Sequence, residues 1–282
     1  MEDRQAVAGT TLVAIEEGQL AVCQFGPPDG SPLFVLHGCP GSRYLRQVGG
    51  EYERQAIRAV TYDRPGYGSS PRVPGRRMVD SARQVVAIAD ALGIDQFAVL
   101  GLSAGGGHAL AVAAVHPERV TKCATIGAFG PAQAEGLDFF ADMPADQRKV
   151  LERVERDGEA YLVRDEYPRL MEFVRSFSSA DVPEPDRSML VETLTEAVRS
   201  GPWGFVDDHL TMMAPWGFEL SRVVCPTRVM LGEDDPTVPR RHGEWMVSQM
   251  PSAELVLAPG GHIGTSRAAE EEELLAWLVR PR

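Results

Sequence analysis

The chain has 282 residues and a net charge of −12, and 44 % of its residues are apolar. This length suits one large domain with an insertion, and the apolar content is ordinary for a globular protein. The acidic balance argues against a nucleic-acid surface, and no apolar run is long enough to cross a membrane.

The cysteines show no paired spacing, and all of them lie in or beside predicted strands: Cys23, Cys39, Cys123 and Cys225. Such cysteines are typical of reduced thiols in a cytoplasmic protein. The first five residues have neither a basic region nor an apolar region, so we expect no secretory signal.

Short apolar runs alternate with amphipathic stretches along most of the chain. Residues 10–26 predict two antiparallel strands, and further strands are expected at 32–37, 57–62, 96–100, 120–126, 225–231 and 253–258. Helices are expected at 44–55, 78–92, 106–115 and 268–279. This alternation predicts an α/β fold with a mostly parallel central sheet flanked by helices on both faces.

Residues 131–215 break the alternation, because they are charged and helix-prone throughout. Helices are expected there at 147–156, 160–177, 185–200 and 205–213, with a break at Pro183 and Pro185. We interpret this segment as a helical cap inserted into a core formed by residues 1–130 and 216–282. A cap excludes water and shapes a pocket for a small molecule.

Large apolar residues of the cap are candidates for a substrate-binding surface: Trp203, Phe205, Met212 and Trp216, with Met213, Phe139 and Phe140 beside them. Aromatic residues and methionines at helical spacing more often pack inside the cap itself. Both interpretations stay open on the sequence.

Ser103 stands in the pentapeptide Gly101-Leu102-Ser103-Ala104-Gly105, between an apolar stretch and a run of small helix-forming residues. A G-x-S-x-G pattern between a strand and a helix is typical of a nucleophile elbow, whose glycines let the two elements pass closely. The hydroxyl then lies at the amino end of a helix, where negative charge is favoured. The pattern predicts a catalytic nucleophile.

A dinucleotide-binding turn is the alternative for this glycine-rich segment. It needs G-x-G-x-x-G and an acidic residue about 20 positions further on. Residues 105–110 lack the last glycine, and the strand at 120–126 carries no acid. The histidines and cysteines also lack zinc spacing, so we expect no cofactor and no metal.

Two further residues complete a catalytic set in the order serine, acid, histidine. Asp235 follows the strand at 225–231, and His262 lies in a glycine-rich loop after the strand at 253–258. Parallel strands end at one sheet edge, so these side chains should converge on Ser103. Asp235 is preferred because it precedes Pro-x-Val-Pro, and Asp234 is the alternative.

The other histidines have ordinary structural explanations on helices or at their ends: His108, His116, His209 and His242. None of them follows a strand after the acid, so none is assigned a catalytic role.

An oxyanion hole is expected in the loop after the strand at 32–37. Acyl transfer builds negative charge on a carbonyl oxygen, which two backbone N–H groups can stabilise. Ala104, the residue after the nucleophile, should supply one N–H, and Cys39 the other. The Cys39 thiol could also react with electrophiles. A plain strand-end turn is the alternative for this loop.

Together these motifs resemble the α/β-hydrolase-fold family of serine hydrolases. Four further segments carry the resemblance, namely HGCPG at 37–41, DRPGYGSS at 63–70, GEDDPTVP at 232–239 and GH at 261–262. They fall in the family's order and span nearly the whole chain outside residues 131–215. The resemblance implies the α/β-hydrolase fold and its triad, but no particular substrate.

Departures from individual branches of the family narrow the expected activity. Epoxide hydrolases and haloalkane dehalogenases of this fold use an aspartate nucleophile, where this chain has Ser103. Prolyl iminopeptidases share HGxPG but usually carry a tryptophan after the nucleophile, where this chain has Ala104.

We therefore expect a serine hydrolase that cleaves a small carboxylic ester or lactone through an acyl-enzyme. The alternatives are C–C bond hydrolysis or aminopeptidase action on the same triad, and a non-catalytic ligand-binding protein. The expected partner is a small-molecule substrate, with no nucleic acid and no membrane. A homodimer is left open.

Overall fold

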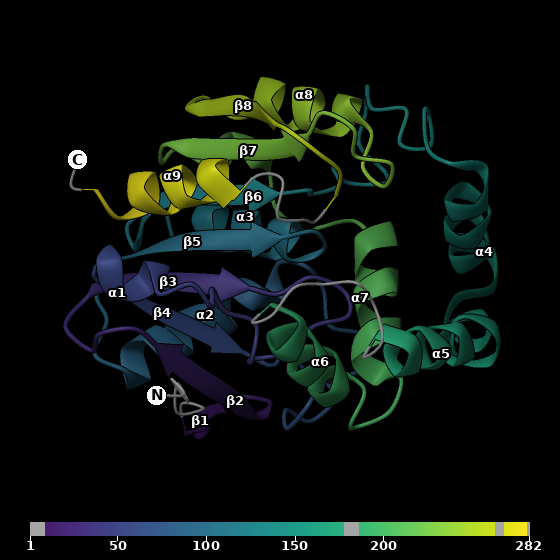
Figure 1. Cartoon of the computed structure of the whole chain (residues 1–282). Helices are drawn as coiled ribbons and strands as arrows, with labels where there is room; N and C mark the ends of the chain where they lie inside the picture. Colours follow the sequence, from purple (N-terminus) through teal and green to yellow (C-terminus); the bar gives the residue numbers. More distant parts are fainter. Residues whose placement is uncertain (1–8, 178–185, 263–267, 281–282) are drawn as a thin grey trace.

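The centre of the molecule is an eight-stranded sheet in the order β1-β2-β4-β3-β5-β6-β7-β8 (Figure 1). It is seen in a computed structural model that describes residues 9–177, 186–262 and 268–280. β2 pairs antiparallel with β1 and β4, and the remaining neighbours in the sheet are parallel. The expected α/β fold with a mostly parallel sheet is confirmed.

The strands coincide closely with the apolar runs of the sequence. Their bounds are β1 Thr11–Ile15, β2 Gly18–Phe25, β3 Ser31–Leu36, β4 Ile57–Tyr62, β5 Phe97–Leu102, β6 Val120–Ile126, β7 Thr227–Gly232 and β8 Ala253–Ala258. The helices outside the cap are α1 Glu51–Arg54, α2 Asp80–Ala91, α3 Gly105–Val115, α8 Arg240–Gln249 and α9 Ala268–Val279, with a 3-10 turn at Leu220–Arg222.

The helix expected at 44–55 is wrong over most of its length, because only α1 is helical there. Gly50 precedes α1 with φ of 78°, a left-handed conformation that an α-helix cannot continue through. Arg43 and Arg46, just before it, use their side chains to bind acids elsewhere in the chain.

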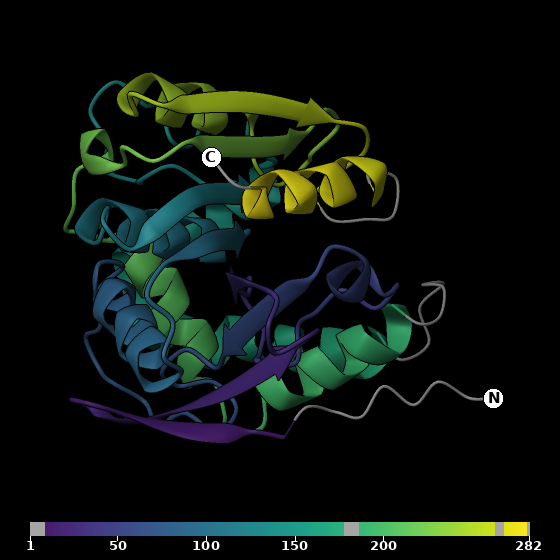
Figure 2. The same ribbon diagram turned by 90° about the vertical axis from the view of Figure 1, so that its left-hand side faces the viewer.

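Helices cover both faces of the sheet, as Figure 2 shows. One apolar core lies under α2, α3 and α8 and includes Ile88, Leu110 and Met246. The other lies under α1 and α9 and includes Tyr52 and Leu275. The parallel strands are therefore buried on both sides, which explains their continuous apolar runs.

The cap segment, defined as residues 131–215, lies beyond the carboxyl ends of the parallel strands (Figure 1). Its described elements are α4 Ala145–Tyr161, a π-helical turn at Leu162–Glu166, α5 Tyr167–Phe177, α6 Asp186–Ala197 and α7 Trp203–Met213. The break expected at residues 183 and 185 lies outside the described residues. A third apolar cluster joins the segment to the core, with Leu151 and Val206 packed near Leu231.

Ion pairs also join the cap segment to the core, with the arginine on the core side each time. Arg43 binds Glu196 at 2.6 Å, and Arg46 binds Glu192 at 2.8 Å. Further along, Arg72 binds both Asp207 and Glu159. In the described part of the chain, no helix is long and apolar enough to span a membrane.

Backbone packs directly on backbone where β5 turns into α3. A Cβ at Gly101 would lie 2.3 Å from the carbonyl oxygen of Gly105, and one at Gly105 would lie 2.2 Å from that of Leu36. No side chain fits at either position, so these glycines fix the distance between strand and helix.

We predict that Gly105→Ala lowers the free energy of unfolding by at least about 2 kcal/mol, because a rigid backbone must move. Gly107→Ala on the same helix is the matched control. Its Cβ would meet the flexible end of Met78 at 2.9 Å and the Trp216 ring at 3.2 Å, with no backbone atom among these contacts. Alanine is also favoured over glycine in a helix by up to about 1 kcal/mol. Urea unfolding of both variants measures the difference, and equal midpoints would contradict the packing argument.

Candidate active site

Ser103 occupies the sharp turn between β5 and α3. Its φ is 51°, a left-handed value that is uncommon for residues other than glycine. The turn is held by two backbone hydrogen bonds. Ser103 N–H donates to the carbonyl of Ile126 at 2.7 Å, and the Ser103 carbonyl accepts from Gly106 N–H at 2.9 Å. The hydroxyl is thereby placed at the amino end of α3.

The structure brings Ser103, His262 and Asp235 together from three strand ends. Nε2 of His262 lies 3.0 Å from Oγ of Ser103, and its Nδ1 lies 2.9 Å from Oδ2 of Asp235. This geometry lets Nδ1–H donate to the carboxylate while Nε2 accepts the serine proton. Asp234 is exposed and does not take this position.

The carboxylate of Asp235 is fixed from its other side as well. Its Oδ1 accepts backbone hydrogen bonds from Thr237 at 2.7 Å and Val238 at 3.0 Å. Burial alone raises the pKa of Asp235, but the hydrogen bonds from His262 and the two amides outweigh it and lower the pKa below its ordinary value. Asp235 is therefore an oriented anion facing the imidazole.

Gly127, directly after β6, makes room for the imidazole and was missed by the sequence analysis. A Cβ there would lie 2.8 Å from Cε1 and 2.9 Å from Nδ1 of His262. Its φ of 63° also favours glycine. A glycine at the end of a strand beside the nucleophile strand was the available signal.

The segments that carry the two expected oxyanion donors both lie close to Ser103. Ala104 precedes the first turn of α3. The loop carrying Cys39 passes so close that a Cβ at Gly38 would lie 3.3 Å from Cβ of Ser103. Among the described residues, no hydrogen bond joins the N–H of Cys39 or Ala104 to a protein acceptor. Both amides can therefore serve a ligand oxygen.

The Cys39 thiol is partly buried and lies among polar groups. Its Sγ is 3.4 Å from the Tyr67 hydroxyl and 3.6 Å from Nδ1 of His209. Burial, followed by the nearby charge of Asp208, raises the pKa of Cys39 to about 12. The thiol is therefore protonated at neutral pH and a poor nucleophile, which argues against reaction with electrophiles.

The four expected substrate-binding residues lie in different surroundings. The Phe205 ring packs against His209 at a tilt of 55°, with ring centroids 4.3 Å apart, and its carbonyl oxygen lies 3.9 Å from Sγ of Cys39. Trp203 lies under the guanidinium of Arg72. Met212 belongs to the cluster that joins cap and core.

Trp216 packs in the core cluster below α3 and stacks on Phe218. Of the expected set, only Phe205 lies next to the oxyanion loop. Met213 and Phe139 lie in the same joining cluster as Met212, and Phe140 packs against it.

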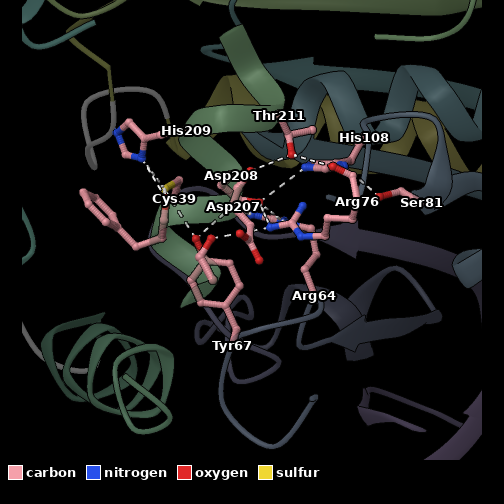
Figure 3. Close-up of polar contacts among 12 residues, drawn as sticks. Cys39, Arg64, Tyr67, Arg76, Ser81, His108, Asp207, Asp208, His209 and Thr211 are labelled. Atoms are coloured by element: carbon pink, nitrogen blue, oxygen red, sulfur yellow. Dashed lines mark hydrogen bonds and ion pairs between the residues drawn. The ribbon is translucent and has the colours of Figure 1, made fainter. Parts of the chain in front are cut away.

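A buried cluster of charges lies behind the oxyanion loop, and Figure 3 shows its members. Asp208 of α7 binds Arg64 and Arg76, each at 2.5 Å, and accepts a hydrogen bond from the Tyr67 hydroxyl at 2.8 Å. His108 of α3 lies 3.6 Å from the same carboxylate. The adjacent aspartates of an otherwise mostly apolar helix were the sequence signal for this cluster.

The charges of the cluster hold one another in their ionised forms. Burial raises the pKa of Asp208, but Arg64 and Arg76 outweigh it and bring the pKa well below its ordinary value. Burial, together with Arg64, lowers the pKa of His108 to about 4. The cluster therefore contains two guanidinium cations, one carboxylate and a neutral imidazole.

His242 is a buried structural histidine on α8. Its Nδ1 accepts from Gly130 N–H at 3.1 Å, and its Nε2 lies 3.1 Å from the carbonyl of Phe139. Burial lowers the pKa of His242 to about 4. It supports the chain that leads from β6 into the cap.

Comparison with known proteins identifies the family. Residues 31–265 match the family model of the alpha/beta hydrolase fold. This match covers most of the chain, so the protein belongs to the α/β-hydrolase family and is a hydrolase.

Among its relatives, the chain is similar to two hydrolases from Burkholderia. It is 28 % identical to the 2-hydroxy-6-oxo-6-phenylhexa-2,4-dienoate hydrolase of Burkholderia cepacia, over 82 % of this chain and 80 % of the relative. It is 29 % identical, with the same coverage, to the 2-hydroxy-6-oxononadienedioate/2-hydroxy-6-oxononatrienedioate hydrolase of Burkholderia vietnamiensis.

Among solved structures, the fold is similar to that of an esterase from Exiguobacterium antarcticum. The TM-score is 0.69 at 21 % identity, covering 96 % of this chain and 99 % of that one. At this identity the likeness concerns the fold alone.

We predict that Gly127→Ala lowers kcat by about 100-fold, since a misplacement of about 1 Å in a catalytic group can have that effect. The new methyl group would overlap the His262 ring. Steady-state kinetics on an activated ester measures the loss. Gly93→Ala is the control, because Gly93 has a similar φ of 66° and open space around it. Equal kcat values for the two variants would contradict the prediction.

The buried histidines predict acid sensitivity. In the unfolded chain, His108 and His242 become protonated below their ordinary pKa of about 6.5. In the folded chain they become protonated only near their lowered pKa of about 4. The stability present above pH 6.5 is therefore lost as the pH falls, by about 1.4 kcal/mol per pH unit for each histidine. Urea unfolding between pH 7.5 and 5 gives the free energy of unfolding at each pH. Its slope against pH should be shallower for His242→Gln than for wild type. His116→Gln, at the C-terminal end of α3, is the control, and slopes that stay unchanged in both variants would contradict the assignment.

Proposed function

We propose that the protein is a serine hydrolase that cleaves a small carboxylic ester or lactone through an acyl-enzyme. The observation that supports this most is the continuous hydrogen-bonded line from Ser103 through His262 to Asp235, at 3.0 and 2.9 Å. These are the distances at which a base can take the proton of an attacking hydroxyl.

The reaction follows from this geometry. Oγ of Ser103 attacks the substrate carbonyl while its proton passes to Nε2 of His262. Asp235 keeps the imidazole oriented and stabilises its positive charge, and the N–H groups of Cys39 and Ala104 bind the oxyanion. The ester C–O bond then breaks, and His262 returns the proton to the leaving alcohol. Water activated by His262 hydrolyses the acyl-enzyme and releases the acid.

The charges beside the oxyanion loop favour a neutral substrate. The guanidinium groups of Arg64 and Arg76 are buried, and both are bound to Asp208. They therefore cannot reach a substrate carboxylate without leaving that partner uncompensated. The same engagement of Asp208 weakens the aminopeptidase alternative, since this carboxylate is not free to bind a substrate amine.

C–C bond hydrolysis is the second candidate, and the two Burkholderia relatives favour it. Their names describe hydrolases of hydroxy-oxo-dienoates. The same triad could serve such a reaction here. Turnover of 2-hydroxy-6-oxo-6-phenylhexa-2,4-dienoate, with inactivity on short esters and lactones, would favour it over the ester proposal.

We predict that a fluorophosphonate adds once to the wild-type protein and not to Ser103→Ala, as read by intact mass. The same variant should lose about 10⁴- to 10⁶-fold in kcat on p-nitrophenyl acetate, because the serine supplies the bond-forming atom. An adduct and undiminished turnover in the variant would overturn the proposal. Ligand recovered unchanged from an unlabelled wild type would favour the non-catalytic alternative.

The neighbouring aspartates Asp234 and Asp235 provide a variant and a matched control that test which of them is the acid of the triad. Asp235→Asn should lower kcat by about 10⁴-fold, because the amide favours the wrong imidazole tautomer. Asp234→Asn should leave kcat close to wild type, since that side chain is exposed. The reverse pattern would assign the role to Asp234.

A further inference from the structure

Arg64 makes an unusual set of contacts for a fully buried arginine. Its Nη1 donates to the carbonyl of His37 at 2.5 Å, and its Nη2 donates to that of Gly38 at 2.9 Å. These carbonyls are consecutive in the oxyanion loop. The two terminal nitrogens of the guanidinium therefore bind two consecutive peptide groups of that loop.

The second of these peptide groups is the one that matters for catalysis. The carbonyl of Gly38 and the N–H of Cys39 belong to the same amide. A hydrogen bond to the oxygen of an amide draws electron density from its nitrogen and makes its N–H a stronger donor. A charged donor has a larger effect than a neutral one. The cation of Arg64 thus acts on the amide expected to bind the oxyanion.

His37 adds a second donor to the same carbonyl. Its Nδ1 lies 2.8 Å from the oxygen of Gly38, and its Nε2 faces the backbone N–H of Arg64 at 3.4 Å. An acceptor at Nε2 leaves the proton of the neutral ring on Nδ1, so Nδ1–H donates to Gly38. The oxygen of this peptide therefore accepts from both an imidazole and a guanidinium.

Asp208 holds Arg64 in place from the cap side. It accepts from Nε of Arg64 at 3.2 Å and from Nη2 at 2.5 Å. Arg76 shares this carboxylate but, among the described residues, makes no hydrogen bond to the oxyanion loop, and its other acceptor is the carbonyl of Gly204. Two buried cations therefore share one anion (Figure 3). Of the two, only Arg64 also donates to the loop carbonyls.

We infer that Arg64 is a positioning residue of the oxyanion hole. Through its hydrogen bonds to His37 and Gly38 it orients the Gly38–Cys39 peptide and strengthens the Cys39 N–H as a donor to the developing oxyanion. The inference rests on the proposed function, since it assumes that this N–H binds the oxyanion. Arg64 acts on the transition state without contacting the substrate.

Kinetics with Arg64→Met and Arg76→Met test this role. Removing a whole oxyanion donor costs about 10²- to 10³-fold in kcat, so weakening one should cost on the order of 10-fold, with KM little changed. Arg76→Met removes an equally buried cation from the same carboxylate and should keep kcat close to wild type. Arg64→Lys keeps the charge but loses the fork, and its kcat should lie between those of wild type and Arg64→Met.

Binding of a boronic acid distinguishes a specific effect on the oxyanion hole from a general disruption of the site. A boronic acid forms a tetrahedral adduct with an active serine and resembles the transition state. Its affinity should fall in Arg64→Met by the same factor as kcat, while the affinity for the carboxylic acid product stays near wild type. A parallel loss of both affinities would indicate a merely structural role and overturn the inference.

The peptide itself can also be observed. Gly38–Cys39 is the only Gly-Cys pair in the sequence, so ¹³C-carbonyl glycine combined with ¹⁵N-cysteine gives one correlated NMR signal. Arg64→Lys retains a buried cation and serves as the test variant if Arg64→Met does not fold. In Arg64→Lys the ¹³C and ¹⁵N chemical shifts of this signal should differ from those of wild type. In Arg76→Lys they should stay near wild type.

The outcomes distinguish the two proposals. A wild type that neither labels with fluorophosphonate nor hydrolyses esters overturns the proposed function and, with it, the catalytic role of Arg64. A wild type that is active, with equal kcat losses in Arg64→Met and Arg76→Met or an unmoved Gly38–Cys39 signal in Arg64→Lys, overturns the inference about Arg64 alone.

Discussion

The candidate active site depends on the direct contact of backbone with backbone behind Ser103. Gly101 and Gly105 let β5, α3 and the end of β3 approach one another without intervening side chains. This approach sets the left-handed turn at Ser103 and brings the oxyanion loop to within van der Waals distance of its Cβ. His262, the candidate base, meets Ser103 at this turn.

A second constraint is the charge buried behind the oxyanion loop. A buried ion pair is weak evidence for stability, because desolvation opposes the attraction of the charges. Here the donors of Arg64 are well satisfied, by Asp208 and by two backbone carbonyls. The cluster therefore fixes how the oxyanion loop lies against α7, apart from its effect on the free energy of unfolding.

The sequence predicted the sheet and the convergence of the three candidate catalytic residues because both depend on local patterns. Apolar runs mark the parallel strands, and residues that follow strand ends mark the edge where Ser103, Asp235 and His262 meet. The helix expected at 44–55 failed because Gly50 is left-handed and Arg43 and Arg46 are held by distant acids. A propensity argument does not include such long-range contacts.

The environment of the site was harder to predict for the same reason. Arg64 lies in the DRPGYGSS loop at 63–70, which is part of the family resemblance. Its contact with Asp208, however, joins residues 144 positions apart. Gly127 matters only because the ring of His262 arrives beside it from another part of the chain. Phe205 and Trp216 are both aromatic candidates in the sequence, yet only the packed structure separates Phe205, beside Cys39, from Trp216, in the core.

The ion pairs between core and cap also limit how this enzyme can be recombined with its relatives. Functions are often regarded as grafted on interchangeable folds. In this chain the core contributes arginines and the cap contributes their carboxylates. A foreign cap without an acid at the position of Asp208 would leave two buried cations uncompensated, a change that typically costs about 3–5 kcal/mol for one broken pair. The cap of this protein is therefore not a freely exchangeable module, and a chimera would have to carry α7 together with the loop that holds Arg64.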